Sequence, residues 1–231
     1  MEHRFLSGEE ARALGVAPPQ GWSVLHEPGG GIVRADRALA ALLETAQARG
    51  ARVETGVQVE SVDGLDADVV VVAAGAWVRA LVPDVPVRVT RETVAYFRHE
   101  GPPLPSVVEL NERSGHALYA LHDPAHGVKA GVHHGGVEAS PDERGEPDPE
   151  IVARASAWVR ERLPGVDPEP VAAETCLYTT TADERFVLER RGRVVVGSAC
   201  SGHGFKFAPV VGRRLAELAL SPDGVSPSSE R

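Results

Sequence analysis

The fold of this chain is decided by the stretch Asp68-Val69-Val70-Val71-Val72-Ala73-Ala74-Gly75. A continuous run of β-branched apolar residues bounded by Asp and Gly is typical of a strand that is covered on both faces. The preceding pattern, from about Asp36 to Gly50, is helical and has a glycine where a C-cap is expected. The apolar face of that helix carries Leu39, Leu42, Leu43 and Ala46. A helix that leads into a buried strand predicts a parallel α/β layer.

Shorter elements are predicted on both sides of that helix. Ser7-Gly8-Glu9-Glu10 has the spacing of a capping box, so we expect a short helix to begin there. A strand is expected at about Trp22–Leu25. Two more short strands are expected between the helix and the buried strand, at Arg52–Glu54 and Val57–Val62.

From Val85 the pattern changes to that of an antiparallel sheet. The segment Val85–His99 is long, strand-like and rich in Val, Thr, Tyr and Phe, and Gly and Asp separate the shorter runs that follow it. Those shorter runs are Ser106–Leu110, Ala117–Leu121 and Val128–His133. Glu138–Asp148 is acidic and weakly patterned, so we expect a loop there. A second subdomain built on antiparallel strands follows from this pattern.

The remaining chain alternates helices and strands again. A helix is expected from Pro149 to about Leu163, with Ile151, Ala155 and Trp158 facing inward. Strand patterns then return at Glu174–Thr180, Phe186–Leu188 and Arg193–Gly197. A final helix is expected from about Gly204 to Leu220, and its apolar stripe is Phe207, Val211, Leu215 and Leu218.

These elements predict an α/β (α+β) fold with an interrupted first domain. We expect residues 1–84 to form part of an α/β domain and residues 85–170 to form the antiparallel-sheet subdomain. Residues 171–220 would return to the first domain and end in the C-terminal helix. Residues 221–231 are expected to be a disordered tail.

Composition and charge narrow the class of protein. The chain has 231 residues and a net charge of −9, which argues against a general binder of nucleic acid or of anionic membranes. No apolar run approaches the length of a membrane span, and the first residues lack the apolar core of a signal peptide, so we expect a cytoplasmic protein. Cys176 and Cys200 make no disulfide scaffold, and no CxxC pair indicates a metal site.

Three constellations carry residues that chemistry uses, and the first is Ser201-Gly202-His203-Gly204-Phe205-Lys206-Phe207. Two glycines flank a histidine, and a lysine follows as the last helix begins. Such a turn brings backbone N–H groups, a helix N-terminus and a cation to one point, which favours developing negative charge. The alternative is a tight turn with a hydrogen-bonded histidine. The combination of residues favours a cofactor or anion site.

The second constellation runs from Gly127 to Gly136. On a strand, Lys129, Gly131 and His133 would point the same way, so an ammonium and an imidazole would share one face with no bulk between them. A planar ligand could then lie close to that face. The alternative is an edge strand on which Lys129 resists aggregation. The pair His133-His134 has no third ligand at a telling spacing, so we discount a metal.

The third constellation is Thr175–Asp183, where Cys176 and Tyr178 alternate onto one face of a strand. One alternative is a buried structural cysteine, which is the commonest fate of a lone Cys. Another is a hydrolytic nucleophile, although no neighbouring residue orients a base as a Cys/His pair requires.

Together these motifs resemble the monomeric sarcosine oxidase and N-methyltryptophan oxidase family, FAD-dependent amine oxidases of the D-amino-acid-oxidase-like superfamily. The resemblance covers nearly the whole chain, and its motifs stand in the family's order. The matching strings are Cys-x-Tyr-Thr-x-Thr-x-Asp-x-x-Phe at Cys176–Phe186, Ser-Gly-His-Gly-Phe-Lys-Phe at Ser201–Phe207, Gly-x-Lys-x-Gly-x-His at Gly127–His133 and Ala-Gly-Ala-Trp at Ala74–Trp77. The first two are quite specific, and the last occurs widely among flavoproteins.

The resemblance implies a role for individual residues. Cys176 matches the cysteine that links covalently to the flavin ring, Lys129 the lysine that promotes reaction with oxygen, and Lys206 a lysine that pairs with the substrate carboxylate. Residues that match the lining of the substrate and flavin pocket are Tyr119, His133, Tyr178 and His203, with the spacing from Tyr119 to Lys129 one residue shorter than in the family. Positions near the cofactor are Val59, Gly75, Ala76, Trp77, Ser201, Gly202, Gly204 and Phe205. Cys200 stands where the family often has an apolar or aromatic residue, so we expect it to be structural.

The chemistry that the resemblance implies is oxidation of a small amino-acid-like amine by FAD and O2. The family attaches FAD covalently, through the position of Cys176, and releases H2O2. Negative charge left on the flavin would be stabilised by a helix N-terminus at Gly204 and by nearby cations. Lys129 would favour the charge formed as oxygen is reduced, and Lys206 would supply a point charge for a substrate carboxylate. Sarcosine, another N-methyl amino acid and a cyclic imino acid all remain open as substrates.

One feature of the family is missing. The family begins with a βαβ unit that carries GxGxxG, and no GxGxxG occurs in these 231 residues. The chain therefore resembles about the last three-fifths of such an enzyme. Three alternatives stay open: a truncated oxidase, a half-enzyme completed by a separate chain that supplies the dinucleotide-binding unit, and a non-catalytic binding or interaction protein. We expect the chain alone to bind FAD weakly or not at all.

Overall fold

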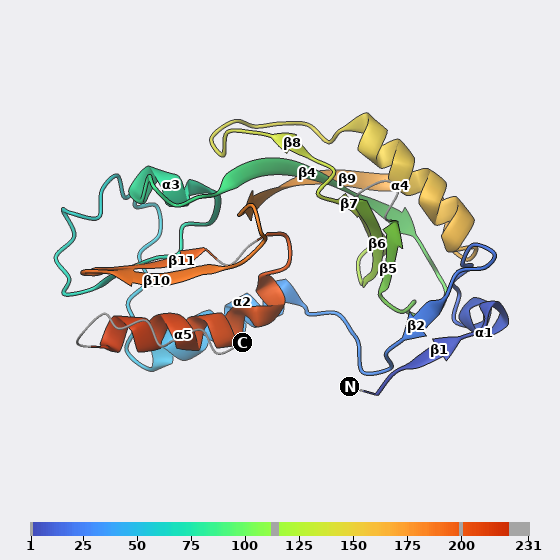
Figure 1. The fold of residues 1–231 in the computed structure, drawn as a ribbon, viewed down its shortest axis with the longest axis horizontal. Coiled ribbons are helices and arrows are strands. Elements are labelled where there is room, and N and C mark those ends of the chain that lie inside the picture. Colours follow the sequence, from blue (N-terminus) through green and yellow to red (C-terminus); the bar gives the residue numbers. More distant parts are fainter. Residues whose placement is uncertain (1, 112–115, 199–200, 222–231) are drawn as a thin grey trace. The chain divides into compact units, whose positions relative to one another are not determined.

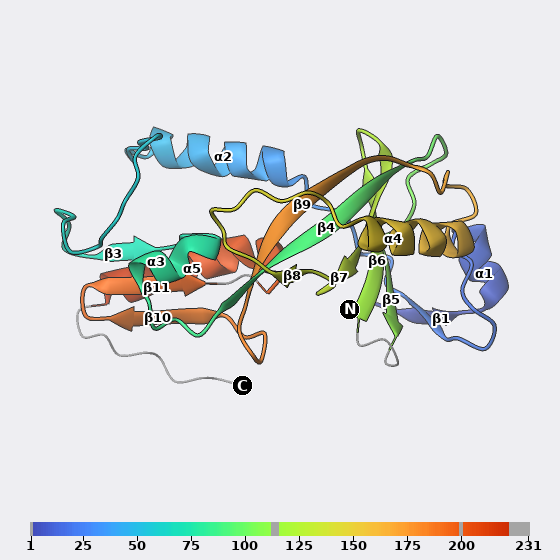
Figure 2. The ribbon, with the colours of Figure 1, turned by 90° about the horizontal axis from the view of Figure 1, so that it is seen from above.

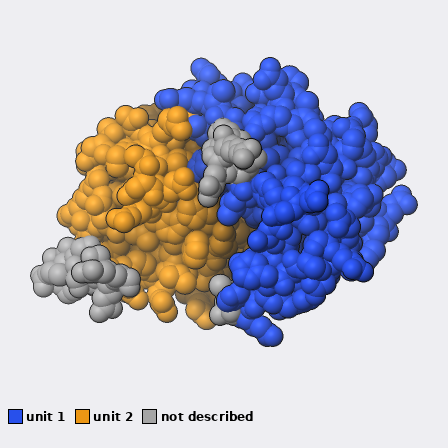
Figure 3. Space-filling model, turned by 45° about the vertical axis from the view of Figure 1, so that its right-hand side comes forward, with its two compact units in different colours: residues 1–32, 90–177 blue, residues 33–89, 178–231 orange. Residues whose placement is uncertain are grey.

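The computed structural model describes residues 2–111, 116–198 and 201–221. Contacts divide the chain into two units, coloured in Figure 3: residues 1–32 with 90–177 form unit 1, and residues 33–89 with 178–231 form unit 2. Each unit mixes helices and strands, so the predicted α/β class is confirmed. The domain boundaries expected at residues 84 and 170 stay a prediction. In the described part of the chain, no helix is both long and apolar enough to cross a bilayer.

A six-stranded sheet forms the centre of unit 1 (Figure 1). The long strand β4 (Arg88–Arg98) pairs with three others, β7, β8 and β9. The three short strands predicted after it are confirmed with small shifts of their ends. The remaining bounds are β5 (Val107–Asn111), β6 (His116–Asp123), β7 (Gly127–His133), β8 (Val137–Glu138) and β9 (Pro170–Thr180).

One face of this sheet is covered by α4 (Pro149–Arg162), seen across the strands in Figure 2. Asp148 caps the helix, since its carboxylate accepts from the N–H of Glu150 at 2.8 Å, and Pro149 fits the first turn, where no N–H partner exists. The predicted inward residues are buried, and Trp158 belongs to the same core cluster as Phe97, which is fully buried. Apolar burial on this face is the main core of unit 1.

Two short antiparallel strands and a helix form the N-terminal part of unit 1. The strands are β1 (Arg4–Leu6) and β2 (Val24–His26), and α1 (Gly8–Ala13) lies between them in sequence. The predicted capping box is confirmed, because Ser7 and Glu10 exchange backbone-to-side-chain hydrogen bonds of 3.1 and 2.8 Å. Hydrogen bonds from the Ser7 N–H and then from Arg4 lower the pKa of Glu10 to about 2.

Unit 2 is built on a smaller sheet in the order β10 (Val187–Arg191), β11 (Val194–Ser198) and β3 (Val70–Val72). The β10–β11 pair is antiparallel and the β11–β3 pair is parallel. Helix α5 (Ala208–Leu220) packs closely on this sheet because Gly197 has no side chain. A Cβ there would lie 2.7 Å from Leu215 Cδ1.

Arg190 fastens the end of α5 to the sheet. Its guanidinium donates to the carbonyl oxygens of Leu218, Ala219 and Ser221. The last carbonyls of a helix have no partner within the helix, so Arg190 supplies both their hydrogen bonds and a cation at the negative end of the helix dipole.

The predicted helix of unit 2 forms, but its apolar face is not covered. Helix α2 (Ala35–Ala48) ends near Gly50, whose φ of 94° is the left-handed conformation expected there. None of its residues is buried, and the side chains of Leu39, Leu42 and Leu43 are 44–56% exposed. Figure 2 shows α2 apart from β3 and from α5.

Three other predictions for unit 2 are wrong. The strands expected at Arg52–Glu54 and Val57–Val62 do not form, because a strand needs a neighbour to pair with and no described strand pairs with them. Strand β3 is not covered on both faces, since Val72 is buried but Val71 is 43% exposed.

The last helix also begins later than predicted. A single 3-10 turn, η2 (Phe205–Phe207), precedes α5, and Phe207 is 42% exposed. Of the predicted apolar stripe, Leu218 alone is fully buried. The predicted tail, apart from Ser221, and Cys200 lie outside the described residues.

Candidate active site

The strand register of unit 1 fixes which side chains share the sheet face opposite α4. Lys129 is paired with Tyr96 of β4 on one side and with Leu121 of β6 on the other, and Gly131 is paired with Tyr119. Directly paired residues point to the same face, whereas the intervening Ala130 lies in the core under α4. The predicted alternation of Lys129, Gly131 and His133 is therefore confirmed.

The space above Gly131 is filled, contrary to the sequence-based expectation of a bare strand. A Cβ on Gly131 would lie 2.9 Å from Tyr119 Oη and 3.1 Å from its Cζ, so the Tyr119 ring lies across this glycine. The interpretation that no bulk separates Lys129 from His133 is wrong. The absence of a side chain at Gly131 makes room for the Tyr119 ring.

Cys176, on β9, lies on the same sheet face as Lys129. Glu174, two residues earlier on β9, accepts a hydrogen bond of 2.9 Å from Tyr96 Oη. Residues two apart on a strand share a face, so Cys176 lies on the side of the sheet that carries Tyr96 and Lys129. Its side chain is exposed, which excludes the alternative of a buried structural cysteine.

The ionisation of Cys176 is set by opposing effects. Desolvation by the atoms packed around it raises the pKa of the thiol, although the side chain reaches solvent at one side. The Lys129 ammonium acts in the opposite direction, and the carboxylates of Glu92 and Glu174 reinforce the rise. The net result is a pKa above the ordinary value, so the neutral thiol is favoured.

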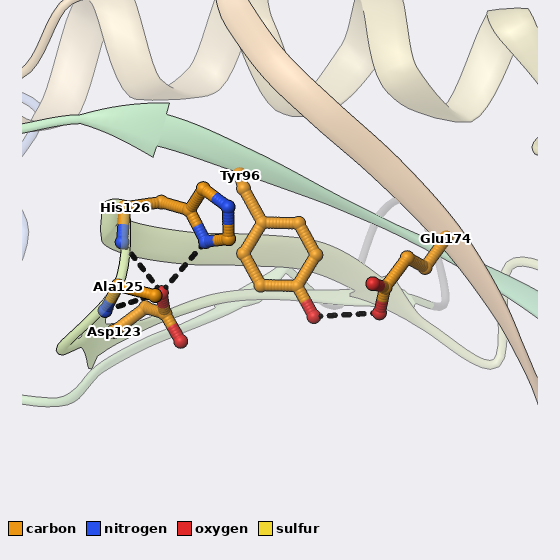
Figure 4. A network of polar contacts seen from close by, with 5 residues as sticks. All are labelled: Tyr96, Asp123, Ala125, His126 and Glu174. Atoms are coloured by element: carbon orange, nitrogen blue, oxygen red, sulfur yellow. Dashed lines mark hydrogen bonds and ion pairs between the residues drawn. The ribbon is translucent and has the colours of Figure 1, made fainter.

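Polar contacts continue along the face beyond Tyr96 (Figure 4). The His126 ring lies 4.8 Å from the Tyr96 ring, centroid to centroid, and its Nδ1 donates to Asp123 at 2.9 Å. Burial alone would raise the pKa of Asp123, but hydrogen bonds from His126 and Ala125 outweigh it and lower that pKa. Burial raises the pKa of Tyr96, and the hydrogen bond to Glu174 adds to the rise, so the phenol stays protonated.

Glu92 is a second carboxylate on this side of β4, and it is 2% exposed. Each of its oxygens accepts one hydrogen bond, from Thr90 Oγ1 at 2.6 Å and from the Gly136 N–H at 2.9 Å. These donors satisfy the buried carboxylate without a direct ion pair among the described residues.

The predicted residues of unit 2 cluster at one edge of its sheet. Strands β3 and β11 are parallel neighbours, so their carboxyl ends meet at the same edge. The turn Gly75–Trp77 follows β3, and the turn Ser201–Phe207 follows β11. Ligands of open α/β sheets bind outside the carboxyl ends of the strands.

The turn after β11 is held by its own hydrogen bonds. Ser201 and Gly202 are both left-handed, with φ of 44° and 71°, and the Ser201 N–H donates to Thr179 O at 2.9 Å. His203 Nδ1 lies 2.8 Å from Ser201 O, so Nδ1 carries the proton, and the His203 ring stacks on Phe186 at 5.3 Å. Gly204 is the N-cap of the 3-10 turn η2, and the α-helix itself begins only at Ala208, so the N-terminus predicted at Gly204 is that of the 3-10 turn and not of the α-helix.

The other predicted residues of unit 2 are more open. Lys206 is exposed, with its Nζ 5.8 Å from the Phe207 ring centroid. Val59 is 40% exposed in a segment without regular structure, and Trp77 is 47% exposed beside the buried Ala76. Gly75 has a φ of 54°, Gly204 and Tyr178 are half-buried, and Phe205 is 39% exposed.

Sequence reasoning missed Tyr96, Glu174 and Glu92. One signal was available, because Glu92 is a charged residue within the apolar run Val85–His99. The contact between Tyr96 and Glu174 had no such signal, since the two residues are 78 positions apart. A cavity of about 410 Å³ elsewhere in unit 1 is lined by Trp22, among others, and by none of the predicted site residues.

The fold is that of the amino acid oxidases. NikD, an unusual amino acid oxidase essential for nikkomycin biosynthesis, superimposes with a TM-score of 0.82 and 25% identity, over 98% of this chain and 67% of NikD. The human peroxisomal sarcosine oxidase is 34% identical over 254 aligned positions, and the monomeric sarcosine oxidase of Bacillus sp. (strain B-0618) is 29% identical over 249. The alignments cover 95% and 94% of this chain but only 65% and 63% of those relatives.

The chain belongs to the FAD dependent oxidoreductase family (DAO), whose model matches residues 1–218. The resemblance to the sarcosine oxidase type, inferred from the four motifs, is thereby confirmed. The chain spans just under two thirds of the length of the curated relatives it matches.

Proposed function

We propose that this chain supplies the reactive half of an FAD-dependent oxidase that acts on the C–N bond of a secondary amine, such as an N-methyl amino acid. Oxygen would be the electron acceptor and H2O2 the product. The observation that carries the proposal is the common sheet face of Tyr119, Lys129, His133 and Cys176. Membership of the FAD family supports the cofactor, and the names of the sarcosine oxidase relatives support the class of substrate.

The residues of unit 1 fit the ring end of the cofactor. An exposed thiol with an ammonium acting on it offers one group that can bond to the ring and one that can stabilise negative charge. The residues of unit 1 that would hold the ring are Cys176 and Lys129. The phosphates lack a corresponding GxGxxG among the 231 residues, so we derive no phosphate contact.

The charged and polar side chains would then have different roles. When bound, the flavin supplies the acceptor for the hydride equivalent and passes its electrons to oxygen. Lys129 keeps a cation fixed on the sheet face, which favours oxygen reduction. Lys206 is free of the core and offers a point charge for the substrate carboxylate. His203 is oriented by Ser201 and Phe186, so its Nε2 remains available to the substrate.

Covalent flavin gives the sharpest test of the proposal. The chain is first combined with the N-terminal dinucleotide-binding unit of a sarcosine oxidase relative, and acid-stable flavin is measured after denaturation. We expect flavin to remain attached in the parent and to be lost in Cys176→Ala, with Cys200→Ala as the matched control that keeps it. Acid-stable flavin in Cys176→Ala would reject the attachment site.

The role of Lys129 is tested by separating the two half-reactions. Stopped-flow absorbance of Lys129→Met should show reoxidation by oxygen slowed far more than reduction by N-methyl amino acids. Equal slowing of both would reject a role in oxygen activation. The chain by itself is expected to bind FAD weakly or not at all, and a yellow protein after gel filtration would contradict this expectation.

A second candidate is a protein that acts through a partner chain. The open faces of unit 2 favour it, because α2 buries no residue and β3 pairs on one side only among the described strands. An isolated helix of this length is only marginally stable in water, so burial of its leucines against another surface would stabilise it. A separate chain with a dinucleotide-binding unit could extend the sheet at β3 and cover α2.

Mixing experiments separate the two candidates. A purified dinucleotide-binding unit should bind the chain, and Leu39→Lys combined with Leu42→Lys should weaken the binding at least tenfold. If binding occurs without flavin uptake or peroxide release, the chain acts as a binding protein. If no binding occurs, the partner candidate is rejected.

A further inference from the structure

Tyr96 and Glu174 connect two strands at the point where Cys176 is displayed. Tyr96 lies on β4 and is 9% exposed, whereas Glu174 lies on the exposed side of β9, which pairs with β4. Their 2.9 Å hydrogen bond fixes the Glu174 carboxylate (Figure 4). Because Tyr96 keeps its proton, it remains a donor across the physiological pH range.

The same two residues border Lys129 and Cys176. Tyr96 is the directly paired neighbour of Lys129 across β4 and β7, and Glu174 precedes Cys176 by one strand period. Burial is the largest influence on the thiol and favours its neutral form, and three charged groups add to or oppose it: Lys129 from β7 opposes it, and Glu92 from β4 and then Glu174 from β9 add to it. Two anions therefore oppose one cation at this thiol.

The two anions differ in how they are held. Glu92 is buried and its oxygens are fixed by Thr90 and Gly136. Glu174 is exposed, and its position depends on the Tyr96 hydroxyl. An exposed side chain without a fixed partner samples many rotamers, so its field at a given atom is weaker on average.

We propose that Tyr96 and Glu174 are positioning residues for Cys176: their hydrogen bond fixes a carboxylate on the strand face that carries the thiol, and this carboxylate adds to burial and to Glu92 in opposing Lys129, so that the thiol is less reactive while no cofactor is bound. The inference rests on the proposed function for its purpose, which is to spare the attachment thiol from alkylation and oxidation. It concerns this chain's own residues and requires no bound flavin.

The test is the pH profile of Cys176 alkylation by iodoacetamide in the cofactor-free full chain. Peptide mass spectrometry follows Cys176 separately from Cys200. Only the thiolate reacts, so the midpoint of the profile reports ionisation and the high-pH plateau reports access. Glu174→Gln keeps an acceptor for Tyr96 but removes the charge. We expect it to react roughly threefold to tenfold faster at pH 7.5, with the plateau unchanged.

Three further variants make the result specific. Glu169→Gln removes the same charge from an exposed residue five positions upstream and should leave the profile unchanged. Lys129→Met should slow alkylation at pH 7.5. Tyr96→Phe should accelerate it, and the double variant with Glu174→Gln should match Glu174→Gln alone, because Tyr96 acts through that carboxylate.

The outcomes decide the proposal in either direction. A Glu174→Gln profile equal to that of Glu169→Gln, a changed plateau without a shifted midpoint, or additive effects of the two substitutions would each overturn it. If Tyr96→Phe loses its circular dichroism spectrum, the comparison of Glu174→Gln with Glu169→Gln still decides. Failure of flavin attachment in the reconstituted enzyme would instead count against the proposed function and leave this result standing.

Discussion

The sheet of unit 1 and the sheet of unit 2 differ in how their faces are used. In unit 1, α4 buries one face of a six-stranded sheet, and the other face carries a connected set of polar side chains. In unit 2, α5 covers three strands, yet α2 buries nothing and Val71 is exposed on β3. The comparison shows that an apolar pattern predicts where a helix or strand forms. It does not predict whether other residues of this chain bury the apolar face of that element.

The largest expected loss of stability comes from a substitution in the core between α4 and the sheet of unit 1. Phe97→Ala removes a fully buried ring beneath α4 and should lower the free energy of unfolding by about 3–5 kcal/mol. Denaturant unfolding monitored by fluorescence in a Trp22→Phe, Trp77→Phe background reports unit 1 through Trp158. A loss below 1 kcal/mol would show that this face is not the core of the unit.

The next effect tests how unit 2 holds its one packed helix. Arg190→Met keeps the length of the side chain but removes the donors to three carbonyls at the end of α5. We expect a loss of about 2 kcal/mol, measured as faster amide hydrogen exchange in residues 208–220. Arg213→Met, on an exposed position of the same helix, is the control and should change exchange little.

A smaller effect tests the polar face of unit 1. Asp123→Asn weakens hydrogen bonds from Ala125 and His126 and should cost about 1 kcal/mol at pH 7. Because folding lowers the pKa of Asp123, its contribution is present above the pKa of the unfolded state and is lost as the pH falls. The difference in stability between the parent and the variant should therefore begin to narrow as the pH falls below about 4. A difference that is the same at pH 2.5 as at pH 7 would contradict this.

The smallest loss of stability is expected for a substitution on the uncovered face of α2, in contrast to the core of unit 1. Leu42→Ala on the uncovered face of α2 should change the stability of the chain alone by less than about 0.5 kcal/mol, although Leu→Ala in a core costs several times more. The measurement is the thermal midpoint by circular dichroism at 222 nm. A loss of 2 kcal/mol or more would mean that α2 is covered in solution.

The elements defined by local pattern could be predicted from the sequence. Val85–His99, the helix after Pro149 and the common face of Lys129 and His133 follow from periods of 2 and 3.6 residues and from caps. The strands expected at Arg52–Glu54 and Val57–Val62 could not be excluded, because a strand depends on a neighbour that local sequence does not reveal. The Tyr119 ring over Gly131 and the bond between Tyr96 and Glu174 depend on contacts between strands far apart in the sequence, so no local spacing encodes them.

The interleaving of the two units has a consequence for synthesis. Unit 1 combines residues 1–32 with residues 90–177, and the first part of unit 2 emerges between them. A ribosome therefore releases residues 33–89 long before β10 and β11 exist to receive β3. The nascent chain must carry the valines of β3 through translation of more than half of the chain before β11 can pair with them. During that interval chaperone binding or aggregation competes with folding.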